Sequence, residues 1–206
     1  MAFRVGVLIS GEGSNLQAIL DTLHGSEVEV VGVASSRPEA RGLDRARDAG
    51  VEAETFGRGA YPDRDARDVA LGNWLADRQV DLVVLAGFME ILGGPFIRRF
   101  QGRIVNVHPS LLPAFPGVRA IEQAVEYGVQ VTGVTVHFVD EGVDSGRVIL
   151  QESFELPYAR DIEAIEKHVH QIEHRLLPRA VSLIAAGAVS VDPDNPRLVR
   201  TGGRDG

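Results

Sequence analysis

The chain has 206 residues, enough for one domain with a sizeable hydrophobic core. Its 21 Lys and Arg against 29 Asp and Glu give a formal charge of −8, which argues against a broad basic surface for nucleic acid. The sequence has no cysteine, which excludes disulfides, thiolate catalysis and Cys-ligated metals.

The N-terminal segment, residues 1–9, is apolar but short, and it lacks the basic start and cleavage site of a signal peptide. The longest apolar stretch, residues 82–88, is far too short to cross a bilayer. We therefore expect a cytoplasmic protein that binds neither membrane nor nucleic acid.

The first half of the chain alternates strand-like and helix-like segments. Apolar, β-branched runs predict buried strands, and apolar residues at helical spacing predict helices. The predicted strands cover residues 3–9, 28–34, 51–56 and 80–87, and the predicted helices cover residues 14–24, 39–50 and 63–78. This order predicts an α/β fold: a mostly parallel, twisted sheet with helices on both faces and a Rossmann-like N-terminal half.

The second half is less regular. The predicted strands cover residues 103–107, 131–139 and 148–154, and the predicted helices cover residues 120–127 and 161–186, the second with a kink near Pro178. The polar, Pro- and Gly-rich segment from Asp192 onward predicts a loose tail. We predict a single domain over residues 1–190, made of two halves at 1–100 and 101–190, and a C-terminal tail at 191–206.

Two glycines punctuate residues 10–16, which join the first predicted strand to the first predicted helix. Glycine lets the backbone turn tightly, and the N–H groups at a helix start can bind an anion. Gly13, Ser14 and Asn15 are therefore candidate phosphate ligands. The alternative is a plain tight turn in which Ser14 caps the helix.

A dinucleotide fits this segment poorly. Leu16 stands where the G-x-G-x-x-G pattern needs its third glycine. The second predicted strand ends in Ser35, Ser36 and Arg37, without an acidic residue to hold a ribose diol. The pattern favours a mononucleotide or a sugar phosphate.

Asn106, His108 and Asp144 are the strongest chemical signal. A neutral histidine can accept a proton at one ring nitrogen and donate one at the other, and a carboxylate such as Asp144 would favour the protonated form of His108. Asn106, two residues earlier on a predicted strand, would project from the same face and donate to a developing oxyanion. The group indicates an enzyme that transfers an acyl group. The alternative is a set of loop residues that only satisfy one another's hydrogen bonds.

The chain resembles the phosphoribosylglycinamide formyltransferases, the folate-dependent transferases of purine biosynthesis and one-carbon metabolism. The resemblance runs in order over roughly residues 3–190 and rests on residues 11–17, 85–92, 106–117 and 133–146. The last two segments are shared by the wider superfamily that uses 10-formyltetrahydrofolate. The first segment, together with Pro116 and Gly117, is specific to the glycinamide ribonucleotide branch.

The resemblance implies that residues 1–100 are the phosphate- and nucleotide-binding half and residues 101–190 the catalytic and folate-binding half. It also implies a role for each matching residue. Glycinamide ribonucleotide would be bound by Gly13, Ser14, Asn15 and Glu173. The folate would be bound by Arg64, Met89, Glu90, Ile91, Leu92, Asn106, Asp140 and Glu141. Asn106, His108 and Asp144 would be catalytic, with His137 in support. Glu90 departs from the family's common Arg and Arg119 from its common His, which leaves the affinity for the folate's anionic tail and any role at position 119 open.

The implied reaction transfers the formyl group of 10-formyltetrahydrofolate, a co-substrate, to the amine of 5'-phosphoribosylglycinamide, and it needs no metal. Asn106 and protonated His108 would stabilise the tetrahedral intermediate while Asp144 assists. The expected partners are these two small molecules, and a homodimer is possible.

Relatives that share the same three residues leave an alternative reaction open, the hydrolysis of 10-formyltetrahydrofolate. The regulatory domain expected of such a hydrolase has no room before Phe3. The acidic charge and short length also disfavour a tRNA acceptor.

A remote alternative lies on the last predicted helix. His170, Glu173 and His174 match the H-x-x-E-H pattern of zinc peptidases. The two histidines are four residues apart and share a helical face, but a third ligand would have to come from elsewhere.

Overall fold

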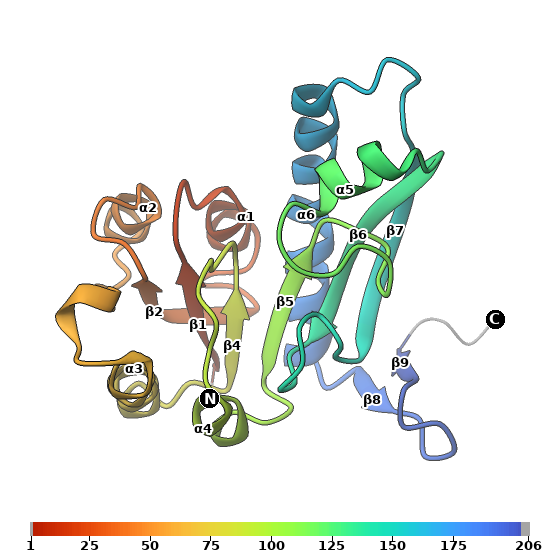
Figure 1. The fold of residues 1–206 in the computed structure, drawn as a ribbon. Coiled ribbons are helices and arrows are strands. Elements are labelled where there is room, and N and C mark those ends of the chain that lie inside the picture. Colours follow the sequence, from red (N-terminus) through yellow and green to blue (C-terminus); the bar gives the residue numbers. More distant parts are fainter. Residues whose placement is uncertain (1, 203–206) are drawn as a thin grey trace. The chain divides into compact units, whose positions relative to one another are not determined.

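A computed structural model describes residues 2–202 of the chain (Figure 1). Seven strands follow the order β3-β2-β1-β4-β5-β6-β7, and β8 pairs with β9 in a separate two-stranded sheet. The chain divides into two compact units, Met1–Asn106 and Val107–Gly206, and the boundary falls inside β5 (Ile104–His108). Each unit is described by itself below.

The first unit is a parallel α/β unit. Its strands are β1 (Phe3–Ile9), β2 (Val28–Ser35), β3 (Ala53–Thr55), β4 (Leu82–Leu85) and the start of β5, and every pairing among them is parallel. Its helices are α1 (Ser14–Thr22), α2 (Gly42–Asp48), α3 (Arg64–Asp77) and α4 (Gly94–Arg99), with a short 3₁₀ turn, η1 (Arg58–Ala60). Figure 1 shows α1 and α2 on one face of these strands and α3 and α4 on the other.

The hydrophobic pattern explains this layering. In β1, Val5, Val7, Leu8 and Ile9 are fully buried, as expected for a strand covered on both faces. Each helix buries one stripe of apolar side chains against the sheet. The loops after β1 and β4 leave the sheet at the carboxyl ends of its strands, where ligands bind in open α/β sheets.

The second unit contains an antiparallel pair of strands and a long helix. Its elements are α5 (Ala120–Tyr127), β6 (Val131–Phe138), β7 (Val148–Glu155), α6 (Ile162–Ala185), β8 (Val189–Val191) and β9 (Val199–Thr201). β6 pairs with β7 antiparallel, and α6 packs against both strands. Asp161 caps α6 by accepting hydrogen bonds from the backbone N–H groups of Glu163 and Ala164.

The predicted fold class, a mostly parallel α/β sheet with helices, is confirmed, and most predicted elements differ from the observed ones by a few residues at their ends. α4 was not predicted, because its 6 residues are too few for a helical period to show. β9 lies in the segment expected to be a loose tail, and α6 continues through Pro178. Residues 203–206 of that predicted tail lie outside the described residues.

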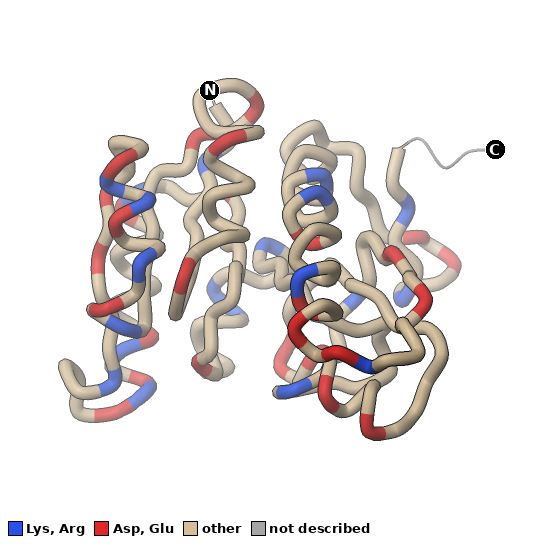
Figure 2. The backbone as a smooth tube through the Cα atoms, turned by 90° about the horizontal axis from the view of Figure 1, so that it is seen from above, with Lys and Arg blue, Asp and Glu red and all other residues tan. Residues whose placement is uncertain are grey.

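Charged side chains are mixed along both units. Figure 2 shows Lys and Arg interspersed with Asp and Glu on the helices. No helix within residues 2–202 is long and apolar enough to cross a membrane.

Candidate active site

The second unit brings one carboxylate between two histidines. Asp144 Oδ2 lies 3.4 Å from His108 Nδ1, and Asp144 Oδ1 lies 3.6 Å from His137 Nε2. His108 stands at the end of β5 and is 5% exposed, and His137 lies near the end of β6 and is 1% exposed. The structure therefore brings His108 and Asp144 together as the sequence analysis expected, and it adds His137 on the other carboxylate oxygen.

The backbone around Asp144 holds its side chain in this position. The N–H of Gly117 donates to Asp144 Oδ2 at 2.7 Å. Asp144 itself has a positive φ of 48°, a conformation that is uncommon outside glycine and occurs often at functional sites. Asp140 orders the same loop, because its Oδ1 accepts from the N–H of Gly142 at 3.1 Å and from Ser145 Oγ at 2.6 Å.

Both histidine rings are oriented by backbone carbonyl groups. His108 Nε2 lies 2.8 Å from the carbonyl oxygen of Phe115, and His137 Nδ1 lies 2.8 Å from that of Phe138. A carbonyl oxygen only accepts, so each of these nitrogens must carry the hydrogen. In each ring the other nitrogen faces Asp144, so each ring is held between a carbonyl group and the carboxylate.

The loop between His108 and Gly117 is fastened to the antiparallel strands. Thr135 Oγ1 donates to the carbonyl of Ser110 at 2.7 Å and accepts from the N–H of Leu112 at 3.1 Å. Gln151 Nε2 donates to the carbonyl of Leu112 at 2.9 Å. Thr135 and Ser110 are fully buried, so these bonds fix the path of the loop that delivers the Gly117 N–H to Asp144.

The pKa of Asp144 is lowered below its ordinary value. Burial is the largest single influence and raises the pKa, because it disfavours the charged form. The hydrogen bond from His137, the hydrogen bond from the Gly117 N–H and the charges of the two histidines together outweigh burial. The site therefore favours an ionised Asp144.

Lowering of the Asp144 pKa links the stability of the fold to pH. The folded-state pKa lies below the unfolded value of about 3.9, so the stabilisation is fully present above that value and is lost as the pH falls through the folded-state pKa. We expect the difference in urea unfolding free energy between wild type and Asp144→Asn to shrink as the pH falls from 5 to below about 4. A difference that stays constant down to pH 3 would contradict this assignment.

Asn106 lies on β5, two residues before His108, where its position pairs with Leu85 of β4. It is half-buried, whereas its neighbours Val105 and Val107 are buried. Residues two apart on a strand project from the same face, so the strand carries both side chains on one side.

In the first unit, residues 10–15 form a tight turn into α1. Gly13 is the N-cap residue, with φ 72°, and no side chain caps the helix, so the alternative in which Ser14 is the cap is wrong. A Cβ on Gly13 would lie 2.6 Å from the Cα of Gly42, the first residue of α2. The turn is therefore packed directly against a second helix start, and glycine is required for both its conformation and this contact.

Hydrogen bonds from α2 hold this turn in place. The N–H of Gly42 donates to the carbonyl of Gly11 at 3.1 Å, and Arg45 Nε donates to the carbonyl of Glu12 at 2.8 Å. Arg41 also pairs with the Glu12 carboxylate at 3.2 Å. These contacts fix the position of the loop before α1, and therefore also of Ser14 and Asn15 in the first turn of the helix.

The same unit links this turn to residues 89–92. The buried Ser10 Oγ lies 2.6 Å from Ser36 Oγ and accepts from the N–H of Met89 at 2.8 Å. Met89 and Ile91 are each 67% exposed, whereas Leu92 is 7% exposed. Two predicted binding segments that are distant in sequence are thus connected through one buried hydroxyl group.

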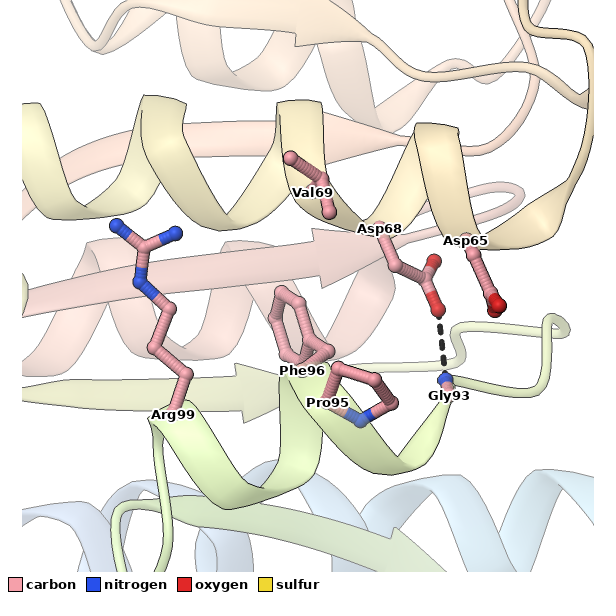
Figure 3. Close-up of a pocket in the computed structure, with 7 residues that line it drawn as sticks. All are labelled: Asp65, Asp68, Val69, Gly93, Pro95, Phe96 and Arg99. Atoms are coloured by element: carbon pink, nitrogen blue, oxygen red, sulfur yellow. Dashed lines mark hydrogen bonds between the residues drawn. The ribbon is translucent and has the colours of Figure 1, made fainter.

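A cavity of about 220 Å³ lies between α3 and α4 in the first unit (Figure 3). It is lined by Asp65, Asp68, Val69, Gly93, Pro95, Phe96 and Arg99. Its lining contains none of the predicted site residues, but it adjoins residues 89–92 through Gly93.

The comparisons with known proteins agree over almost the whole chain. The family described as formyl transferase matches residues 3–181. The chain belongs to the formyl transferase family.

Individual relatives carry more specific names. A phosphoribosylglycinamide formyltransferase of Mycobacterium tuberculosis is 43% identical over 91% of this chain and 87% of its own length. The crystal structure of glycinamide ribonucleotide transformylase 1 from Symbiobacterium toebii is 46% identical, with a TM-score of 0.92, and covers 97% of this chain and 94% of that one. The trifunctional purine biosynthetic protein adenosine-3 of Bos taurus is 45% identical over 95% of this chain, but the chain spans only 19% of its length.

The remaining predicted site residues of this formyl transferase lie as follows. Arg64 is the first residue of α3, with its Nε 3.7 Å from Asp65 Oδ1 and about half of its side chain exposed. Glu141 is exposed in the loop before Asp144, and Glu173 is buried on α6. Arg119, at the start of α5, lies 3.3 Å from Glu122 and 3.8 Å from Glu126, so its guanidinium forms ion pairs within this helix.

The zinc alternative gains no third ligand from the described part of the chain. The rings of His170 and His174 stack with centroids 6.2 Å apart on α6. No group of three or more metal-binding side chains that could hold an ion is found within residues 2–202. Burial, and to a smaller extent the charge of His170, lowers the pKa of His174, which favours its neutral form.

Sequence reasoning missed two kinds of residue in this site. The backbone groups of Phe115 and Gly117 orient the His108–Asp144 pair. Every residue has a backbone carbonyl group, and all but proline have an N–H, so residue type does not reveal such contacts. Arg67 and Asp68 on α3 are buried at 1% and 4% exposure. They could have been found, because Arg67 shares a helical face with Leu71 and Leu75, and a charge on an apolar stripe needs a buried partner.

Proposed function

We propose that this chain transfers the formyl group of 10-formyltetrahydrofolate to the amine of 5'-phosphoribosylglycinamide, a step of de novo purine biosynthesis. The observation that carries the proposal is the His108–Asp144 pair, 3.4 Å apart, with Asp144 held by the Gly117 N–H. The names of relatives such as the Mycobacterium tuberculosis phosphoribosylglycinamide formyltransferase support the same acceptor and the transfer of a formyl group. The cytoplasmic location expected from the sequence is part of this proposal.

The turn at residues 10–15 would bind the phosphate of the nucleotide. Helix starts present N–H groups without helical partners, and the partial positive charge there favours an anion. Gly13 adopts the left-handed conformation that shapes this turn, and Ser14 and Asn15 add side-chain donors. Glu173 would hold the glycinamide or ribose end of the same substrate.

The folate would be bound by residues 89–92 together with Arg64, Asn106, Asp140 and Glu141. The exposed side chains of Met89 and Ile91 offer apolar surface to an aromatic ring system, which supports this part of the proposal. The cationic side chain of Arg64 would meet the anionic tail of the folate.

The reaction would proceed by direct attack. The amine nitrogen forms a bond to the formyl carbon, and the carbonyl electron pair moves onto the formyl oxygen. Asn106 donates a hydrogen bond to this oxyanion, and the positive charge of protonated His108 stabilises it. When the carbonyl re-forms, the bond between carbon and N10 breaks, and the proton lost by the amine is passed to N10.

Asp144 has two tasks in this scheme. As an ionised carboxylate it keeps His108 protonated and oriented, and it accepts the amine proton, directly or through a water molecule. The 3.4 Å separation from His108 is long for a hydrogen bond, and such contacts often tighten when substrate binds. His137 supports the arrangement by fixing the second oxygen of Asp144.

The proposal is tested by measuring formyl transfer with the purified chain. Tetrahydrofolate release is followed by absorbance and formylated nucleotide by mass spectrometry, with 5'-phosphoribosylglycinamide, initiator methionyl-tRNA and water as competing acceptors. The two products are expected to form in a one-to-one ratio and only when the nucleotide is present. Release of formate and tetrahydrofolate at the same rate without the nucleotide would instead establish the hydrolase alternative.

Replacing Gly13 with alanine is expected to raise the KM for the nucleotide by at least about tenfold, the loss expected when hydrogen bonds to a charged group are disturbed. The added Cβ would meet Gly42 at 2.6 Å and force the turn to move. Gly25→Ala is the matched control, since Gly25 has the same φ of 72° but open space around its Cβ. Equal nucleotide KM values in the two variants would contradict a phosphate-binding role for this turn.

A further inference from the structure

Residues 89–93 follow β4, and two adjacent residues of α3 bind the buried side of this segment. The outward side of the segment exposes Met89 and Ile91, at 67% each. The inward side contacts Arg67 and Asp68, which are 1% and 4% exposed. The segment therefore has one face open to a ligand and one face fixed to the protein.

Arg67 makes contacts in three directions. Its Nη2 donates to the carbonyl of Ile91 at 3.0 Å, and its Nη1 donates to Glu90 Oε2 at 3.0 Å. Its Nε and Nη2 also donate to Asp68 Oδ1, at 2.9 and 2.6 Å. The guanidinium thus lies between two carboxylates and donates to one backbone carbonyl. Lysine cannot reproduce this planar, multidentate contact.

Asp68 completes the attachment at the other end of the segment. Its Oδ2 accepts from the N–H of Gly93 at 2.6 Å, as Figure 3 shows. A Cβ on Gly93 would lie 3.2 Å from this oxygen, so the backbone approaches the carboxylate closely. Together, Arg67 and Asp68 fix the segment at Glu90, Ile91 and Gly93.

Two arginines compensate the charge of Glu90. Its carboxylate lies 3.0 Å from buried Arg67 and 2.6 Å from Arg58, whose side chain is 75% exposed. Arg58, Arg67, Asp68 and Glu90 together have no net charge. The anionic tail of a folate would therefore meet a compensated carboxylate rather than a bare negative charge.

We propose that Arg67 and Asp68 are positioning residues for the formyl donor, and that Arg67 makes an acidic residue at position 90 compatible with a polyanionic folate. This inference rests on the proposed function, in which residues 89–92 bind the folate. Arg67 contacts the buried side of residues 89–93. It fixes the backbone that faces the donor, and it compensates the charge of Glu90.

The first experiment measures steady-state kinetics of Arg67→Met with each substrate varied in turn. The KM for 10-formyltetrahydrofolate is expected to rise about tenfold or more, as the loss of a charge-assisted hydrogen bond implies, while kcat and the nucleotide KM change by less than about threefold. Arg99→Met is the control, because Arg99 lines the α3–α4 cavity together with Asp68 and Gly93 but its guanidinium donates to Asn73. A donor KM within twofold of wild type would overturn the proposal.

A rescue experiment separates charge compensation from simple loss of packing. In Arg67→Met the carboxylate of Glu90 keeps only its exposed partner Arg58, so Arg67→Met/Glu90→Gln is expected to regain several-fold in donor KM. A double variant no better than the single one would overturn the charge-compensation part. If Arg67→Met does not fold, Arg67→Lys takes its place. It keeps the charge but loses the multidentate contact, and its donor KM is expected to lie more than twofold above wild type but below the value expected for Arg67→Met.

Amide hydrogen exchange tests the attachment without relying on activity. Exchange in the peptide covering residues 88–94 is expected to be faster in Arg67→Met than in wild type, and unchanged in Arg99→Met. Wild-type protein that shows no formyl transfer would refute the proposed function, whereas an active wild type with unchanged exchange in Arg67→Met would refute this inference alone.

Discussion

Replacing His108 with alanine is expected to lower kcat for formyl transfer by about 10³-fold, within the range of about 10²–10⁴ that one acid–base group supplies. The variant loses the positive charge proposed to stabilise the formyl oxygen, and it loses the partner of Asp144, which lies 3.4 Å away. The turn at residues 10–15, where we propose that the phosphate binds, belongs to a different part of the chain, so the KM for the nucleotide should stay within a few-fold of wild type.

His170→Ala is a suitable control for this measurement. His170 is an exposed histidine on α6, and near wild-type turnover in this variant would also speak against the zinc alternative. Near wild-type kcat in His108→Ala, measured from the initial rate of tetrahydrofolate release, would remove His108 from the mechanism.

Replacing Asp144 with asparagine is expected to lower kcat by on the order of 10³-fold, because the neutral amide neither holds His108 protonated nor accepts the amine proton. An asparagine can still accept a hydrogen bond from the Gly117 N–H, so the fold should persist at neutral pH. Asp44→Asn, which removes an exposed carboxylate paired with Arg47, is the control and should keep wild-type kcat.

A double variant tests whether the two residues act as one unit. If Asp144 works largely through His108, His108→Ala/Asp144→Asn should be nearly as active as His108→Ala alone, since effects within a catalytic unit are not additive. Losses that multiply to about 10⁶ would mean that Asp144 and His108 act independently.

Local patterns were sufficient for most of the fold. The buried run of β1 and the apolar stripe of α1 predicted their elements closely, because burial of one face imposes a period that a short window of sequence contains. The short helix α4 and the hairpin of β8 and β9 were missed, because they contain too few residues for a period to show.

The candidate site divides in the same way. The side chains of Asn106, His108 and Asp144 stood out by residue type, and the glycines of residues 10–16 by their spacing. The sequence could not show that one carboxylate oxygen of Asp144 faces His108 and the other faces His137. It depends on contacts between residues far apart in the chain, such as the Gly117 N–H and Asp144, which are 27 positions apart.

The departure at Glu90 illustrates the difference most clearly. In the sequence it is a charge reversal of unknown effect on folate affinity, 23 positions from Arg67. In the folded chain its carboxylate is paired with a buried guanidinium that also binds the carbonyl of Ile91.

Periodicity and residue type are local properties, so a linear chain was enough to indicate the α/β architecture, the family resemblance and the candidate reactive side chains. Which groups meet became evident only in the folded chain: the two histidines on Asp144, the close contact of Gly13 with Gly42, and Arg67 with Glu90. Burial makes these contacts specific, since a polar group removed from water must find a partner wherever the fold brings one.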